Sequence, residues 1–168
     1  MDVKLAGLLS ELAYGETISN DIKWQALQQD GWVMEGPEDT GYGTGGVAGA
    51  FRIFRNINPD RKEIVIAFKG SSTVGEFIDD LTASGRAVIS NVVARAQIAF
   101  GDPSSPGPTS LLGRFPDYRI YTTGHSLGGT AAQSFALLNG LDTYFFNSLP
   151  VSSTLLAQKA ASEGKTSD

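Results

Sequence analysis

The sequence predicts an α/β fold in three layers, with helices on both faces of a mostly parallel sheet. Two observations lead to this prediction. Short apolar or β-branched runs alternate along the chain with amphipathic or alanine-rich segments, as in folds that pair strands with crossover helices. Residues 64–68 are apolar at every position, which is typical of a strand covered on both faces. The 168 residues, 41% of them hydrophobic, suffice for one core, so residues 1–168 are expected to form a single domain.

The first half of the chain shows two helix patterns and two strand patterns. Leu5, Leu8, Leu9 and Leu12 share one face of a helix that Asp2 is placed to cap. Glycine and proline mark the connections. The further elements expected here are a helix at 21–30 ended by Gly31, a surface loop at 36–49, a strand around 51–53, a turn at 58–60 and the central strand 64–68.

The second half continues the alternation of helices and strands. A long helical pattern covers residues 76–100, with Gly85 as a candidate break. Gly140 is placed to end a helix that starts at Leu127. The elements expected, in order, are the helix 76–100, a loop at 101–107, a strand at 119–123, the helix 127–139, a strand at 143–147 and a final helix at 153–163.

Composition and charge exclude several classes of function. The net charge is −5 and no basic patch stands out, so neither nucleic acid nor an anionic membrane surface is an expected partner. The absence of cysteine excludes disulfides, thiolate metal sites and cysteine nucleophiles. No metal or organic cofactor is predicted. His125 is the only histidine in the sequence.

The sequence carries no sign of a targeting segment. Its first residues lack a basic stretch followed by a long apolar run and a small-residue cleavage site. No stretch approaches the roughly 18 apolar residues of a membrane span. The sequence therefore does not indicate a cellular compartment.

The segment from Gly124 to Gly129 follows a predicted strand and precedes a predicted helix. It contains Gly-x-Ser-x-Gly, the nucleophile elbow, in which a tight turn lifts a serine to the C-terminal edge of a sheet. Gly124 and Gly128 leave room for the neighbouring backbone there. The alternative is a glycine-rich turn whose serine has no catalytic role. The motif predicts Ser126 as a nucleophile, with His125 packed beneath the elbow.

Three segments together resemble one protein family. Residues 115–129 join Phe-Pro-Asp-Tyr-Arg-Ile to Thr-Gly-His-Ser-Leu-Gly-Gly. Residues 64–71 read Ile-Val-Ile-Ala-Phe-Lys-Gly-Ser and precede Phe-Ile-Asp-Asp-Leu at 77–81, and residues 145–151 form a weaker match. In this order and spacing, residues 62–152 resemble the class 3 lipases, which are α/β-hydrolases of the fungal triacylglycerol lipase type. Lys69 replaces the arginine that is usual in the family.

The resemblance implies a role for each matching residue. Ser126 would attack an ester carbonyl, and the backbone N–H groups of Leu127 and Ser71 would form the oxyanion hole. Val74, Phe77 and Ile78 would belong to a lid or to a wall of the acyl pocket. The alternative for these three residues is an ordinary amphipathic helix on the core.

The resemblance also implies that two catalytic groups are missing. A serine hydroxyl needs a base that is oriented by an acid, yet no histidine follows Ser126 in this sequence. The family carries both groups on loops after two further strands, so the domain is expected to be truncated on its C-terminal side. A missing C-terminal segment, a partner chain or a second copy at the open sheet edge would supply them. The alternatives are a relative that has lost its triad and a weak esterase without a histidine.

Two functions are therefore predicted from the sequence. The first is a serine carboxylic-ester hydrolase of the lipase, esterase or phospholipase kind, which acts on an ester or lipid substrate through an acyl-enzyme. The second is a non-catalytic module that binds a lipid or acyl ligand on the same scaffold, an outcome that fold analogy alone does not exclude.

Overall fold

The structure is a computed structural model that describes residues 1–15, 18–35, 51–70, 83–151, 156 and 159–161. Its helices are α1 (Val3–Leu12), α2 (Ile22–Gln29), α4 (Ala83–Phe100), α5 (Leu111–Arg114) and α6 (Leu127–Asn139). Its strands are β1 (Trp32–Met34), β2 (Phe51–Asn56), β3 (Glu63–Phe68), β4 (Arg119–His125) and β5 (Asp142–Phe146).

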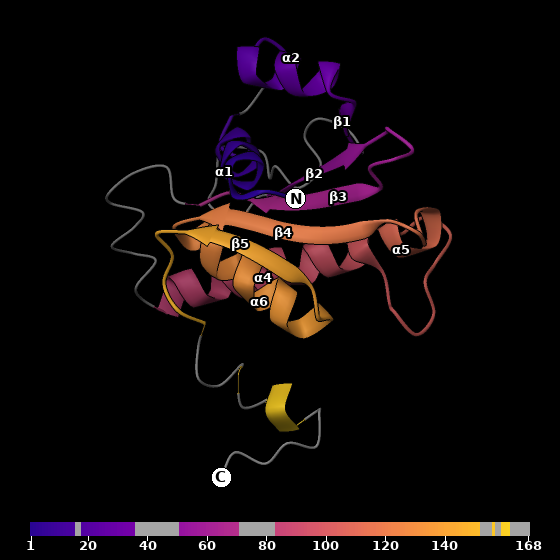
Figure 1. Ribbon diagram of the computed structural model, residues 1–168. Coiled ribbons are helices and arrows are strands. Elements are labelled where there is room, and N and C mark those ends of the chain that lie inside the picture. Colours follow the sequence, from indigo (N-terminus) through magenta and orange to yellow (C-terminus); the bar gives the residue numbers. More distant parts are fainter. Residues whose placement is uncertain (16–17, 36–50, 71–82, 152–155, 157–158, 162–168) are drawn as a thin grey trace.

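The elements form three layers, as the sequence predicts. Helix α1 lies on one face of the sheet, and α4 and α6 lie side by side on the other (Figure 1). Asp2 caps α1, since its carboxylate accepts a hydrogen bond of 2.9 Å from the N–H of Leu5. Gly140 ends α6 in the left-handed conformation. The caps expected at these two helices are therefore confirmed.

The sheet is mixed, with the strand order β1-β2-β3-β4-β5. Strands β3, β4 and β5 are parallel, whereas β1, β2 and β3 pair antiparallel. The difference follows from the connections. The short turn at residues 57–62 joins β2 to β3 and suits only antiparallel neighbours, while α4 and α6 provide the long crossovers that parallel neighbours require. The parallel part of the sheet is the half that carries the predicted elbow.

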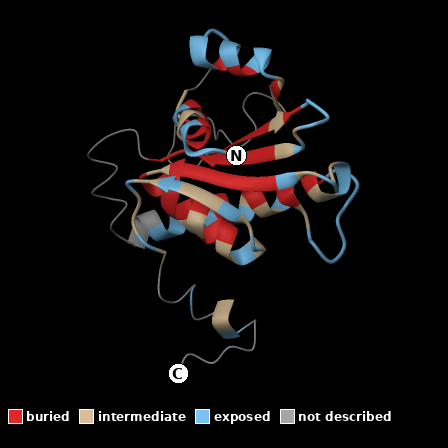
Figure 2. Ribbon diagram, in the orientation of Figure 1, coloured by how far each residue is buried: buried red, intermediate tan, exposed pale blue. Residues whose placement is uncertain are grey.

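The central strand β3 is buried on both faces, as its uniform apolar character predicts. Ile64, Ile66 and Phe68 pack in the core beneath α4 and α6. Val65 and Ala67 point the other way, into the core beneath α1. Figure 2 shows β3 and β4 buried along nearly their whole length. The end of β4 is therefore supported by side chains packed on both faces of the sheet.

Some local features differ from the sequence-based expectations. The short elements β1 and α5 were not expected from the sequence, and α4 runs through Gly85 without a break. In the predicted final helix 153–163, Leu156 and residues 159–161 are helical. The predicted loop 36–49, residues 76–82 of the long helical pattern and the rest of the final helix lie outside the described residues.

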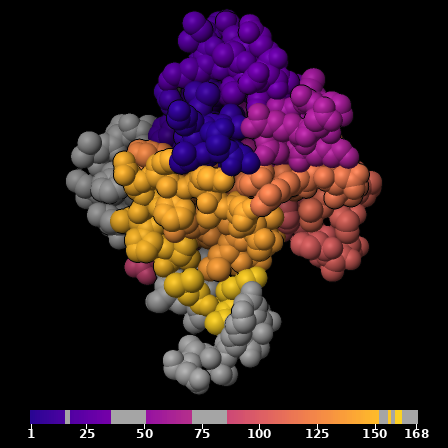
Figure 3. Space-filling model, viewed as in Figure 1, coloured from indigo at the N-terminus to yellow at the C-terminus, as the bar shows by residue number. Residues whose placement is uncertain are grey.

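Strand β5 is an edge of the sheet in the described part of the chain. Its burial is lower than that of β4 (Figure 2), and the side chain of Phe145 is 49% exposed. The space-filling view shows β5 and the residues after it on the visible surface (Figure 3). Unpaired edge strands offer their backbone groups to another strand.

Within the described ranges, no helix is both long and apolar enough to cross a membrane.

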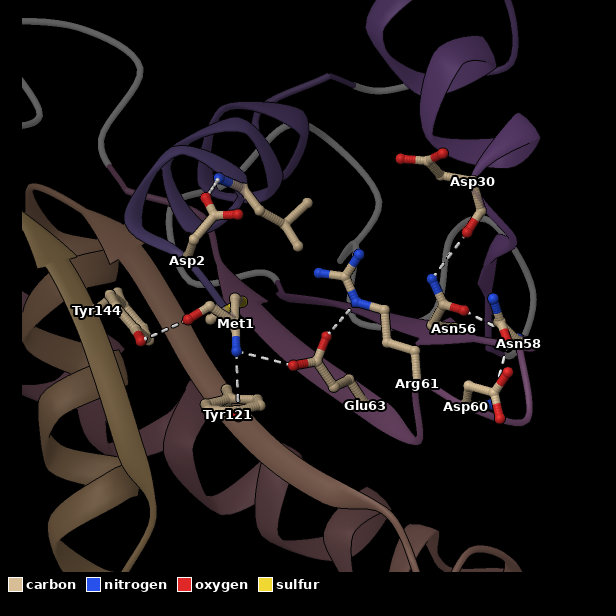
Figure 4. A network of polar contacts seen from close by, with 11 residues as sticks. Met1, Asp2, Asp30, Asn56, Asn58, Asp60, Arg61, Glu63, Tyr121 and Tyr144 are labelled. Carbon is tan, nitrogen blue, oxygen red and sulfur yellow. Dashed lines mark hydrogen bonds and ion pairs between the residues drawn. The ribbon is translucent and has the colours of Figure 1, made fainter.

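A polar network joins the start of the chain to the end of the sheet remote from the predicted elbow (Figure 4). The Met1 ammonium donates to the Glu63 carboxylate at 2.8 Å and to the Tyr121 hydroxyl at 3.2 Å. Arg61 Nε donates to the other oxygen of Glu63 at 2.6 Å, and the Tyr144 hydroxyl donates to the carbonyl of Met1. Burial raises the pKa of Glu63, but the hydrogen bonds from the ammonium and Arg61 outweigh it and hold that pKa below its ordinary value.

Glu63→Gln is expected to reduce stability at pH 7 and to flatten its dependence on acidic pH. Because the folded-state pKa lies below the unfolded value, Glu63 stabilises the fold above pH 4.5 and loses this effect as pH falls through the folded pKa. Urea unfolding at pH 7 and pH 3 measures the effect, and the gap between wild type and variant should shrink at the lower pH. Glu11→Gln is the control, since Glu11 pairs with Lys23 at an exposed site. A gap that is constant with pH would contradict the prediction.

Candidate active site

Ser126 occupies the sharp turn between β4 and α6 in a backbone conformation that side chains rarely adopt. Its φ is 56° and its ψ is −129°. Conformations of this kind cost on the order of 1–3 kcal/mol and persist only where the surroundings enforce them. The enforcement comes partly from β5, because the Ser126 N–H donates to the carbonyl of Phe146 at 2.9 Å. The turn therefore has the strained strand-to-helix backbone that is expected of a nucleophile elbow.

The two glycines of the motif lie where backbone segments touch. A Cβ at Gly124 would overlap the carbonyl of Gly128. A Cβ at Gly128 would overlap the carbonyl oxygen of Phe68 and would lie 2.7 Å from the carbonyl carbon of Lys69. The N-terminus of α6 therefore packs directly on the segment that follows β3, and glycine is required for this approach.

The start of α6 places backbone N–H donors beside Ser126. Ser126 is the N-cap residue, but its hydroxyl makes no capping hydrogen bond. The first N–H groups of a helix have no partner within the helix, and the helix dipole adds partial positive charge there. Leu127, the first residue of α6, is buried with its N–H at this terminus. Ser126 itself keeps 8% of its surface exposed. A negative charge that develops near Ser126 would be stabilised at this point.

His125 lies next to Ser126 but belongs to the other face of the sheet. Its Nδ1 atom is 2.9 Å from the hydroxyl of Tyr14, just beyond the end of α1. The same hydroxyl donates to the carbonyl oxygen of His125 at 3.2 Å. Sequence reasoning missed Tyr14, because no local pattern connects residues 111 positions apart.

The segment after β5 is hydrogen-bonded to α6. Asn147 adopts a φ of 46°, which asparagine tolerates better than most residues. Gln133 Nε2 donates to the Ser148 hydroxyl at 2.7 Å, and the Thr130 hydroxyl donates to the carbonyl of Leu149 at 2.9 Å. These bonds hold the chain close to the elbow as it leaves β5.

Four of the predicted site residues lie outside the described residues. They are Ser71, expected in the oxyanion hole, and Val74, Phe77 and Ile78, expected in a lid or acyl-pocket wall. Gly70, which precedes Ser71, is described and touches the elbow: a Cβ there would lie 3.3 Å from the N atom of Gly128. Lys69 is 4% exposed.

The acidic residues that flank the last two strands lie at the opposite end of the sheet. Asp142 starts β5, pairs in register with Tyr121 and binds Arg119 at 2.6 Å. Asp117 precedes β4 and lies 3.8 Å from Lys62. Neither carboxylate is placed to orient a base at Ser126. Among the described residues, no cluster of three histidine or acidic side chains could hold a metal ion.

The three-dimensional comparison finds fungal lipases. The lipase of Rhizopus microsporus var. chinensis superposes with a TM-score of 0.65 at 19% identity, over 97% of this chain and 62% of the lipase. A fungal lipase in complex with an inhibitor gives 0.60 at 20% identity, over 97% and 67%. The Lip2 lipase of Yarrowia lipolytica gives 0.54 at 19% identity, over 85% and 55%.

No family model and no curated sequence matches the chain. The 168 residues span less than two thirds of the length of the Rhizopus lipase. The chain nevertheless aligns over nearly its whole length, with its mixed sheet and both helical layers included. It therefore has the α/β-hydrolase fold of the fungal lipases.

Proposed function

We propose that this chain carries the nucleophile half of a serine carboxylic-ester hydrolase, with Ser126 as the nucleophile. The observation that carries the proposal is the conformation of Ser126, held at φ 56° on the rim of the sheet with its hydroxyl unused by the helix cap. Strain of this size is retained where a fold gains something from it. A hydroxyl that makes no capping bond at a helix N-terminus suits an attack that creates an oxyanion.

The proposed reaction passes through an acyl-enzyme. The Ser126 oxygen bonds to the ester carbonyl carbon, and the carbonyl oxygen becomes an oxyanion facing the N–H of Leu127 and, in our proposal, that of Ser71. When the tetrahedral intermediate collapses, the bond to the alcohol oxygen breaks and the alcohol leaves with the serine proton. Water then attacks the acyl carbon, which releases the acid and restores the hydroxyl.

The proton must pass through a base, and the described part of this chain places none beside Ser126. His125 is the only histidine in the sequence, and its Nδ1 bonds to Tyr14 on the α1 face. We propose that a histidine and its acid come from a segment or chain that adds to the sheet at β5. Two observations support this edge as the place where such a segment or chain would pair. Phe145 is half exposed there, and the residues after β5 are hydrogen-bonded to α6 beside the elbow.

In the protein together with the segment or chain that supplies its base, Ser126→Ala is expected to abolish labelling by a fluorophosphonate probe, because the probe forms its bond to an activated serine oxygen. Mass spectrometry of the labelled peptide should place the adduct on Ser126 in the wild type. Ser134→Ala is the matched control, since Ser134 is a buried serine of α6 whose hydroxyl bonds to the carbonyl of Thr130. The control should label at the wild-type rate. Labelling that survives in Ser126→Ala would overturn the assignment.

A second function is favoured by the position of His125, whose Nδ1 bonds to Tyr14 and not to Ser126. The chain would then bind a lipid or acyl ligand on the hydrolase scaffold without turning it over. A wild type that resists the probe but binds a fatty acid, measured by calorimetry, is the result expected for this module.

A further inference from the structure

We propose that Tyr14 is a positioning residue, which joins the end of α1 to the elbow and sets the orientation of Ser126. This inference rests on the proposed function, because it concerns how the nucleophile is held. Tyr14 stands outside the motif that suggested the active site, and its ring makes a tilted contact with that of His125, with centroids 6.0 Å apart.

The hydroxyl of Tyr14 makes two contacts with one residue of the elbow. It lies 2.9 Å from Nδ1 of His125 and 3.2 Å from the carbonyl oxygen of the same residue. A tyrosine hydroxyl has a single hydrogen. Both contacts are hydrogen bonds at once when Tyr14 donates to the carbonyl and Nδ1–H of His125 donates to Tyr14. The geometry thus assigns the Nδ1–H tautomer to His125 and fixes both its ring and its carbonyl.

That carbonyl belongs to the peptide group that leads into Ser126. Its orientation fixes the direction from which the chain enters the strained turn, so the bond from Tyr14 bears directly on the φ of Ser126. The next N–H in the chain, that of Ser126, donates to Phe146. The peptide between His125 and Ser126 is therefore held at its oxygen by Tyr14 and at its nitrogen by Phe146 of β5.

The same hydroxyl also borders the segment after β3. A Cβ at Gly70 would overlap both the Tyr14 hydroxyl and the carbonyl of His125. Tyr14, Gly70 and His125 are thus in mutual contact at one point. The segment that follows β3 is therefore in contact with the elbow at Gly70.

Tyr14 is itself held in place by a buried charge. Arg52 of β2 is 2% exposed and donates to the carbonyl of Leu12 at 2.8 Å and to that of Gly15 at 2.6 Å. These carbonyls flank Tyr14 on either side. A buried guanidinium is costly unless its donors are satisfied, so these bonds resist displacement of the segment. A chain of contacts therefore runs from Arg52 through Tyr14 to the elbow.

The test compares Tyr14→Phe, which removes one oxygen atom, with the wild type. We expect the maximal rate of fluorophosphonate labelling to fall about tenfold to a hundredfold, the scale on which small misplacements of reacting groups act. The half-saturating probe concentration should stay unchanged. Tyr144→Phe is the matched control, because its hydroxyl also donates to a backbone carbonyl, that of Met1, and it should label normally.

Nuclear magnetic resonance of the single histidine supplies a readout that a purely structural role would not change. In the wild type, nitrogen shifts should show Nδ1 protonated, and in Tyr14→Phe the neutral ring should shift toward the Nε2–H form. Tyr144→Phe should keep the wild-type spectrum.

The outcomes separate the two proposals. If the wild type labels on Ser126 and Tyr14→Phe labels equally fast, the role of Tyr14 is overturned while the hydrolase proposal stands. If the histidine spectrum is the same in both proteins, the role of Tyr14 is likewise overturned. If the wild type does not label, the proposed function fails, and the positioning role fails with it.

Discussion

Gly128→Ala is expected to destabilise the protein by about 1–2 kcal/mol and to abolish labelling of Ser126. Gly-to-Ala inside a helix ordinarily stabilises by roughly 0.5–1 kcal/mol. Here the added Cβ would overlap the carbonyl oxygen of Phe68, and overpacking costs of about 1–3 kcal/mol reverse the sign. Relief requires α6 to move away from the end of β3, which would separate the proposed oxyanion donors. Urea unfolding and probe labelling measure the two effects.

Gly107→Ala is the matched control for that experiment. A Cβ at Gly107 would meet no atom within 4 Å, so the change should leave both stability and labelling close to wild type. If Gly128→Ala were as stable as Gly107→Ala, the close approach of the elbow to the end of β3 would be wrong. The geometry proposed for the oxyanion hole would then lose its basis.

Phe135→Ala is expected to lower the free energy of unfolding by about 3–5 kcal/mol, the usual cost of removing a buried phenylalanine ring. Phe135 of α6 is fully buried, and its ring centroid lies 5.8 Å from that of Phe68 and 5.4 Å from that of Phe100. One side chain thus joins α6 to β3 and α4. Since native domains are stable by only about 5–15 kcal/mol, this loss would remove much of the margin.

Thermal unfolding measures this loss as a fall in the midpoint of roughly 10 °C for a chain of this size. The control is Leu138→Ala on the same helix, where the side chain is 43% exposed and the change should stay within about 0.5 kcal/mol. Equal effects at the two positions would mean that α6 does not pack on the sheet as described. A Phe135→Ala variant that still labels on Ser126 at the wild-type rate would contradict a link between the core and the elbow.

The two predictions concern two different contacts of the same helix, α6. Phe135 anchors α6 to the sheet through apolar burial, and Gly128 lets its first turn approach the backbone after β3. The strain at Ser126 is sustained by both, because a turn at φ 56° would relax if either contact were lost. Core packing and the proposed chemistry are therefore physically linked through α6.

Much of the fold could be predicted from local patterns. The continuous apolar run of β3, the leucine face of α1 and the glycine stop of α6 each reflect short-range rules and are found in the structure. The strand-turn-helix around Ser126 was predictable for the same reason, since strand, turn and helix are adjacent in sequence. The antiparallel half of the sheet was not foreseen, because β1 has three residues and its partner β2 lies beyond residues 36–50.

The sequence by itself determined the alternation of elements, the elbow motif and the absence of a histidine after Ser126. The tertiary structure alone decided that Tyr14 meets His125, that Arg52 holds the segment around Tyr14 and that Gly70 touches the start of α6. The physical reason is sequence distance. Periodicity and turn chemistry report on residues within a few positions of one another, whereas these contacts join residues that become neighbours only once α1 docks on the sheet and β3 pairs with β4.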